Sequence, residues 1–283
     1  LFPYTTLFRS RRSARPHPFQ PRLAAPVAHV ARKRFGQHFL ADRSVIARIV
    51  DAIAPRDGER LLEIGPGQGA LTSALLQRVG HLSAIEIDRD LAAGLRRRYG
   101  DRLTLIEGDV LAVDLAEALG AGPVRVVGNL PYNISSPLLV RLIAVRDRVA
   151  DQHFMLQKEV VDRIVAAPAT AAYGRLGVLL QAYYDVESLF DVPPEAFEPP
   201  PKVDSSVVRM LPRSASPAVA PETLSPLLAV AFGQRRKMLR NTVLPWLSAR
   251  RVDASALPPT ARAEEIPVQV WLEVAARLAQ ASA

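Results

Sequence analysis

Cysteine is absent from the 283 residues, which excludes disulfide bonds, thiolate metal ligands and cysteine nucleophiles. The five histidines show none of the spacings typical of a metal site, so we expect no bound metal. Apolar runs of transmembrane length are also missing, so we expect a soluble chain without a membrane partner. The lack of cysteine fits a reducing compartment, and we expect a cytoplasmic protein that acts as a monomer.

Acidic residues are missing from the first 34 positions, which contain eight Lys and Arg. The other 28 Lys and Arg balance the 28 Asp and Glu, so the net charge of +8 comes from this one segment. Whole-chain charge therefore does not argue for nucleic acid binding. Residues 1–31 lack apolar periodicity and predict a disordered tail, and residues 1–10 resemble the translation of a sequencing-library adaptor.

Strand and helix patterns alternate between about residues 60 and 211, which predicts an α/β fold with a doubly wound sheet. Within this region, residues 176–184 are apolar and rich in strand-forming residues. The composition changes near Pro212, and the remaining residues show only helical periodicity, such as the apolar stripe of Leu224, Leu227, Leu228 and Ala231. We expect an α/β domain over residues 32–212 and a small helical domain over residues 213–283.

A polar turn follows the predicted buried strand at residues 124–128. In this turn, the Asn129 side-chain oxygen and the Leu130 carbonyl can both accept hydrogen bonds from an exocyclic amino group. Pro131 removes a competing donor, and Tyr132 offers a ring on which a base can stack. Because open α/β sheets bind ligands at the carboxyl ends of their strands, we expect these four residues to be catalytic. The alternative is a simple strand-to-helix turn with an Asn cap.

Two earlier strands also end in residues suited to a nucleotide. A Gly-x-Gly-x-Gly turn that includes Gly65 and Gly67 follows the first strand and lets the backbone approach a ligand closely. Glu86 ends the next strand and can bind ribose hydroxyls, while Asp109 follows the third and can accept from an adenine amino group. The alternative for Asp109 is a turn residue that caps the next helix. These features alone also fit a dinucleotide-dependent dehydrogenase, although that class favours Gly-x-Gly-x-x-Gly.

Basic residues cluster again in the C-terminal part of the chain. Residues 209–251 contain eight Lys and Arg against one acid, Glu222. Four of these cations predict an RNA-contacting face: Arg235, Arg236, Lys237 and Arg240. A solvated helix end is the alternative.

Taken in order, eight motifs resemble the ribosomal RNA small subunit adenine dimethyltransferase family, which contains the dimethyladenosine transferase linked to kasugamycin sensitivity. The similarity covers about residues 32–275. No single motif is specific, but the ordered set is. The motifs are Phe35–Leu40, Glu63–Gly69, Glu86, Asp109, Asn129–Ser135, Phe154–Glu159, Phe197–Ser205 and Phe232–Lys237.

The resemblance implies a class I S-adenosylmethionine-dependent methyltransferase with a Rossmann-like, seven-stranded sheet. It implies N6,N6-dimethylation of two adjacent adenosines near the 3′ end of 16S rRNA within the 30S particle, during ribosome biogenesis. It assigns Phe197 to the target base, which it would sandwich with Tyr132. It assigns six residues to the cofactor: His38, Leu40, Gly65, Glu86, Asp109 and Asn129. Many members of the family have Asn at the position of His38.

Three related classes remain as alternatives. A 23S rRNA adenine methyltransferase of the antibiotic-resistance type shares the sheet and the Asn-x-Pro-Tyr turn. A non-catalytic relative, such as a ribosome assembly factor or a mitochondrial transcription factor, is disfavoured because Asn129 and Tyr132 are both present. A DNA adenine methyltransferase usually adds a separate recognition domain, which is not evident here.

Overall fold

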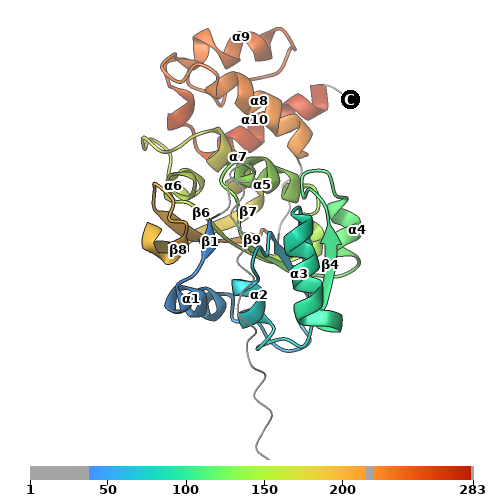
Figure 1. The fold of residues 1–283 in the computed structure, drawn as a ribbon. Coiled ribbons are helices and arrows are strands. Elements are labelled where there is room, and N and C mark those ends of the chain that lie inside the picture. Colours follow the sequence, from blue (N-terminus) through green and yellow to red (C-terminus); the bar gives the residue numbers. More distant parts are fainter. Residues whose placement is uncertain (1–37, 215–218, 282–283) are drawn as a thin grey trace, which may run out of the picture.

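The computed structural model describes residues 38–214 and 219–281 (Figure 1). The predicted tail over residues 1–31 lies outside the described residues. So do residues 35–37 of the first family motif. Among the described residues, no helix is long and apolar enough to cross a membrane.

A seven-stranded sheet forms the centre of the molecule, with the strand order β4-β3-β2-β5-β6-β9-β7. The first five strands in this order run parallel, whereas β9 pairs antiparallel with both β6 and β7. The predicted doubly wound α/β architecture is confirmed. The strands are β2 (Leu61–Ile64), β3 (Leu82–Glu86), β4 (Leu103–Glu107), β5 (Val124–Asn129), β6 (Val149–Gln157), β7 (Tyr184–Val192) and β9 (Ser205–Pro212).

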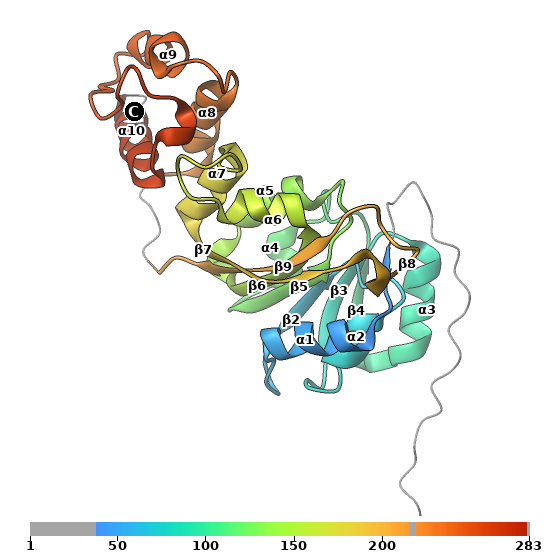
Figure 2. The same cartoon turned by 90° about the vertical axis from the view of Figure 1, so that its left-hand side faces the viewer.

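Helices cover both faces of this sheet (Figure 2). One face packs against α1 (Arg43–Ile53), α2 (Ala70–Leu75) and α3 (Arg89–Tyr99). The other face packs against α4 (Leu115–Leu119), α5 (Ser135–Ile143), α6 (Lys158–Val165) and α7 (Arg175–Tyr183). Each face buries its own apolar cluster, which is why strands such as β2 are buried at every residue.

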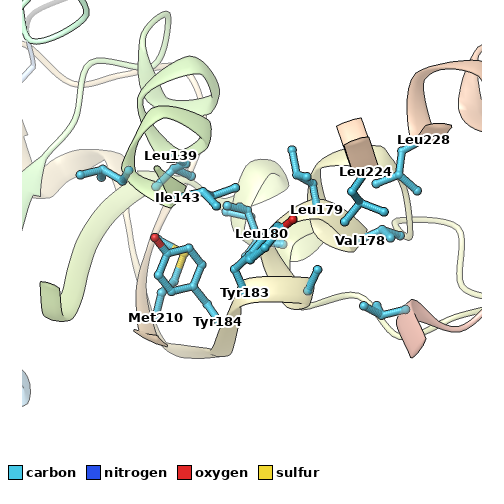
Figure 3. Close-up of a cluster of buried hydrophobic side chains, with 14 of the residues drawn as sticks. Leu139, Ile143, Val178, Leu179, Leu180, Tyr183, Tyr184, Met210, Leu224 and Leu228 are labelled. Carbon is cyan, nitrogen blue, oxygen red and sulfur yellow. The ribbon is translucent and has the colours of Figure 1, made fainter. Parts of the chain in front are cut away.

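The prediction of strand structure across residues 176–184 is wrong, because α7 occupies most of this segment. Six of its nine residues are buried, so its sequence lacks the amphipathic period that identifies a surface helix. Figure 3 shows why: α7 side chains lie between Leu139 and Ile143 of α5 and Leu224 and Leu228 of α8. The strand β7 begins only at the end of this helix.

The C-terminal helices are α8 (Pro221–Phe232), α9 (Val243–Ser248) and α10 (Val268–Ala281). In α8 the buried residues Leu224, Leu227, Leu228 and Ala231 are those of the predicted apolar stripe. One buried cluster runs from the sheet through α7 into α8 and α10. The helical lobe is therefore fixed to the sheet by apolar packing, and the boundary between residues 212 and 213 stays a prediction.

A two-stranded sheet joins distant parts of the chain. The strands β1 (Phe39–Leu40) and β8 (Phe197–Glu198) pair antiparallel, with Leu40 opposite Phe197. The backbone N–H of Ala41 also donates to the Ala196 carbonyl over 2.8 Å. We name this pairing the β1–β8 clasp. It brings the first described residues over the carboxyl ends of the parallel strands, where the polar turns lie.

Candidate active site

A pocket lies at the carboxyl ends of β2, β3, β4 and β5, closed on one side by the β1–β8 clasp. This is the edge at which open α/β sheets bind ligands. The structure brings together around this pocket every residue predicted for cofactor or base: His38, Leu40, Gly65, Gly67, Glu86, Asp109, Asn129, Leu130, Pro131, Tyr132 and Phe197. Their individual roles remain proposals.

The glycine turn between β2 and α2 forms the floor of the pocket. Gly65, Gly67 and Gly69 have φ values of +68°, +57° and +80°, a region that L-residues with side chains rarely adopt. A Cβ atom on Gly67 would lie 3.2 Å from the Phe39 ring. The sequence therefore requires glycine here both for the turn and for the close approach of β1.

The Glu86 carboxylate joins the end of β3 to this turn. One oxygen accepts from the Gly67 N–H and the other from the Asp88 N–H, both over 2.9 Å. Glu86 is buried, and this burial raises its pKa. Each oxygen has a further lone pair, so the carboxylate can still accept a ribose hydroxyl.

Asp109 lies at the exposed rim of the pocket, after β4. One carboxylate oxygen accepts from the Leu111 N–H over 2.8 Å and caps the following turn. The turn-capping role considered as the alternative is therefore present. Because a carboxylate has two oxygens, this bond leaves Asp109 able to accept from an adenine amino group as well.

Glu63 is a pocket residue to which the sequence analysis assigned no role. It is 2% exposed and accepts from the Thr72 hydroxyl over 2.6 Å. Burial raises the pKa of Glu63 to about 7, and the nearby Glu86 carboxylate adds to this effect. The sequence signal was a carboxylate inside an otherwise apolar four-residue strand, a position where a charge is expensive.

The charge of the pocket favours a cationic ligand. Three acidic side chains line it, from Glu63, Glu86 and Asp109, of which Glu63, with a pKa of about 7, is only partly ionised at neutral pH, while no Lys or Arg lines it among the described residues. A dinucleotide would place a pyrophosphate dianion beside these carboxylates without a counter-ion. S-adenosylmethionine carries a sulfonium, an ammonium and one carboxylate, a net positive charge that this acidic lining would stabilise, so the residues present fit this cofactor and disfavour the dehydrogenase alternative.

The amide of Asn129 has a defined orientation. Its Nδ2 donates to the His38 carbonyl over 3.0 Å. Since a carbonyl can only accept, this bond fixes the amide with Oδ1 on the other side, available as an acceptor. The Leu130 N–H donates to the Met155 carbonyl of β6, and the Leu130 carbonyl accepts no bond from any residue the structure describes.

Tyr132 has a ring neighbour that was not predicted. Its ring is stacked with the ring of His38, with centroids 5.8 Å apart and an angle of 28° between the planes. The His38 ring donates through Nδ1 to the Pro199 carbonyl over 2.8 Å, because a carbonyl can only accept. Phe197 lines the pocket but is 4% exposed in the clasp, so its predicted sandwich with Tyr132 stays a prediction.

The basic cluster of the C-terminal lobe divides into two kinds of cation. The Arg235 guanidinium donates to the carbonyls of Ala171 and Tyr173 and pairs with Glu264 at 3.3 Å. Two other cations counted in the sequence, Arg209 and Arg213, also pair with acids.

By contrast, Arg236, Lys237 and Arg240 are exposed and form no ion pair within the described part of the chain. Across residues 38–214 and 219–281, no group of three or more His, Cys, Asp or Glu is placed to bind a metal.

Comparisons with known proteins identify the family of this chain. The profile of the ribosomal RNA adenine dimethylase family matches residues 28–280. A ribosomal RNA small subunit methyltransferase A from Leptothrix cholodnii is 57% identical over 255 residues, covering 89% of this chain and 93% of that protein. The namesake from Bordetella petrii is 57% identical over 259 residues, covering 90% and 98%.

Two crystal structures share the fold. A dimethyladenosine transferase from Plasmodium falciparum is 25% identical, with a TM-score of 0.73 over 87% of this chain and 98% of that chain. The 23S rRNA methyltransferase ErmE is 27% identical, with a TM-score of 0.64 over 86% and 100%. The chain belongs to the ribosomal RNA adenine dimethylase family and is an S-adenosylmethionine-dependent rRNA adenine dimethyltransferase.

Proposed function

We propose that this chain dimethylates N6 of two adjacent adenosines in a loop near the 3′ end of 16S rRNA. The substrate is the 30S particle in the cytoplasm, and the enzyme acts as a monomer during ribosome biogenesis. The observation that carries the proposal is the Asn129–Tyr132 turn at the mouth of a pocket lined by three acidic side chains. The small-subunit relatives at 57% identity support the choice of rRNA.

Residues of the pocket would bind the cofactor in distinct ways. Glu86 accepts the ribose hydroxyls, Asp109 accepts the adenine amino group, and the backbone at Gly65, Gly67 and Leu40 packs against the ligand. When bound, S-adenosylmethionine would supply an electrophilic methyl group on a sulfonium sulfur, whose bond to the methyl carbon breaks as the new N–C bond forms, leaving a neutral thioether.

Asn129 and Leu130 act on the nucleophile. The N6 lone pair of adenine is delocalised into the ring, so the amino group is a poor nucleophile. Accepting its two hydrogens at Asn129 Oδ1 and the Leu130 carbonyl favours a pyramidal nitrogen and stabilises the positive charge that develops. The N6 proton becomes acidic only after the methyl has transferred and then passes to water, so no general base is required.

Tyr132 and Phe197 act on the base, which must leave its helix or loop to enter the pocket. Stacking on an aromatic ring compensates for the lost stacking in RNA, by about 1–3 kcal/mol per base. It also restricts the plane in which N6 can lie, so the nucleophile is aligned before the reaction begins.

The central experiment measures tritiated methyl transfer from S-adenosylmethionine to 30S subunits that lack the two dimethyladenosines. We expect about four methyl groups per particle for the wild type, and a loss of at least about a hundredfold in rate for Asn129→Ala. Cofactor affinity and thermal unfolding of the variant are measured alongside. Labelling of 30S by the variant at the wild-type rate would contradict the assigned role of Asn129.

A 23S substrate is the second candidate, because the fold is shared with ErmE. The same assay with 23S rRNA in place of 30S separates the two. Methyl transfer to 23S rRNA alone would leave the chemistry intact and overturn the proposed substrate.

RNA contact by the C-terminal lobe is tested through salt. We propose that Arg236, Lys237 and Arg240 contact phosphates, whereas the carbonyl and Glu264 partners of Arg235 favour a structural role for that side chain. Each phosphate contact contributes about 0.7–0.9 to the slope of log affinity against log salt. We expect Arg236→Ala and Lys237→Ala each to lower that slope by about this amount for 30S binding. Arg235→Ala is the comparison and should leave the slope unchanged.

A further inference from the structure

Tyr132 lies in a short turn between β5 and α5, outside the hydrogen-bonding ladders of the sheet. Its side chain nevertheless has a fixed end, because its hydroxyl is 2.9 Å from the hydroxyl of Ser205. Burial raises the pKa of Tyr132, so its hydroxyl stays protonated and able to donate near neutral pH. The hydroxyl end of the ring proposed to stack on the base is thus held by a residue 73 positions away, while the ring itself lies against the ring of His38.

Ser205 is a rigid anchor for this bond. It is the first residue of β9 and is 1% exposed. Its backbone is paired on both sides, with Gln157 of β6 and with Val192 of β7. The backbone that carries this hydroxyl is therefore held by two neighbouring strands, which suits a group that positions another side chain.

The two methyl transfers depend differently on that ring. Before the first transfer, N6 has two hydrogens, and both proposed acceptors, Asn129 Oδ1 and the Leu130 carbonyl, are satisfied. After it, N6 has one hydrogen and one methyl, so one acceptor loses its bond. Stacking on Tyr132 must then supply a larger share of the alignment, and any freedom of the ring costs the second transfer more than the first.

We propose that Ser205 is a positioning residue that fixes Tyr132 for the second methyl transfer, so that the product is dimethyladenosine. This inference rests on the proposed function. Ser205 touches neither cofactor nor base in this assignment and acts only through the tyrosine hydroxyl.

The test is a single-turnover time course on 30S subunits, in which N6-monomethyladenosine and N6,N6-dimethyladenosine are quantified after nuclease digestion. The variants are Ser205→Ala, Tyr132→Phe and the double variant. Ser206→Ala is the matched control, since this neighbour is also buried but its hydroxyl bonds to Ser188 and Phe190 in β7. Thermal unfolding and cofactor affinity are measured for each protein.

We expect Ser205→Ala and Tyr132→Phe each to raise the monomethyl-to-dimethyl ratio about fivefold, the effect of one lost hydrogen bond. The double variant should resemble either single variant, because the same bond is lost. Cofactor affinity should not change, and Ser206→Ala should give the wild-type ratio.

Three results would overturn the proposal: a wild-type ratio for Ser205→Ala, additive effects in the double variant, or an equal change in Ser206→Ala. Failure of the proposed function itself is distinct, because the wild type would then leave 30S unmethylated.

Discussion

Replacing Glu63 by glutamine should stabilise the protein at alkaline pH, because the buried carboxyl is costly to ionise. In an unfolded chain this group ionises near its ordinary pKa of 4.5, whereas burial raises the folded pKa to about 7. Between these values the folded state binds more protons than the unfolded state, so stability falls as pH rises through the window. Each pKa unit corresponds to about 1.4 kcal/mol, which gives a loss of about 3 kcal/mol that is complete above about pH 7.

Glutamine retains the shape of the side chain and an acceptor for the Thr72 hydroxyl, but it cannot ionise. We therefore expect Glu63→Gln and wild type to have similar free energies of unfolding below about pH 4.5. Above about pH 7 the variant should be more stable by about 3 kcal/mol. Urea denaturation of the free protein across this range measures the difference.

Glu59→Gln serves as a control of opposite sign. The Arg56 N–H and Arg125 lower the pKa of Glu59, so this carboxylate stabilises the fold above its ordinary pKa and that stability is lost as pH falls. Its replacement should therefore reduce stability at neutral pH. A difference between Glu63→Gln and wild type that does not vary with pH would refute the reasoning.

Two further predictions concern packing and charge, each with a matched comparison. Gly128→Ala should lower the free energy of unfolding by about 3 kcal/mol or more, because the added Cβ would lie 2.4 Å from the Ile64 carbonyl oxygen. Gly94→Ala, in open space on α3, should raise the free energy of unfolding by about 0.5–1 kcal/mol. Arg125→Ala should lower the free energy of unfolding by about 3 kcal/mol, because the largely buried Asp151 carboxylate loses its arginine partner and keeps only His153 at 3.4 Å. Arg78→Ala, in an exposed pair, should lower it by less than about 1 kcal/mol. Urea denaturation measures all four, and equal effects within either pair would contradict the argument.

Most of the fold followed from local patterns in the sequence. Alternating apolar strands and amphipathic helices predicted the doubly wound sheet, and the stripe from Leu224 to Ala231 predicted α8. The strand prediction for residues 176–184 was wrong for a physical reason. A helix buried on nearly every side has no polar face, so its sequence does not differ from that of a buried strand.

Sequence patterns also predicted the pocket residues at the carboxyl ends of the parallel strands, whereas His38, Leu40 and Phe197 were assigned from the family resemblance alone and Glu63 had no predicted role. Glycine turns, Glu86, Asp109 and the Asn129 turn each follow a strand, and parallel strands present their carboxyl ends at one edge. Chemistry and strand order were therefore sufficient to bring them together, without knowledge of any contact.

Contacts between distant residues were decided only by the tertiary structure. The His38 carbonyl that orients Asn129 and the Ser205 hydroxyl that fixes Tyr132 lie 91 and 73 positions from their partners. The partners of Arg235 likewise come from other segments of the chain. They distinguish Arg235 from its basic neighbours, although the run looks uniform in the sequence. Local sequence sets propensity and side-chain chemistry over a few residues, whereas hydrogen-bond partners depend on which segments the folded core brings side by side.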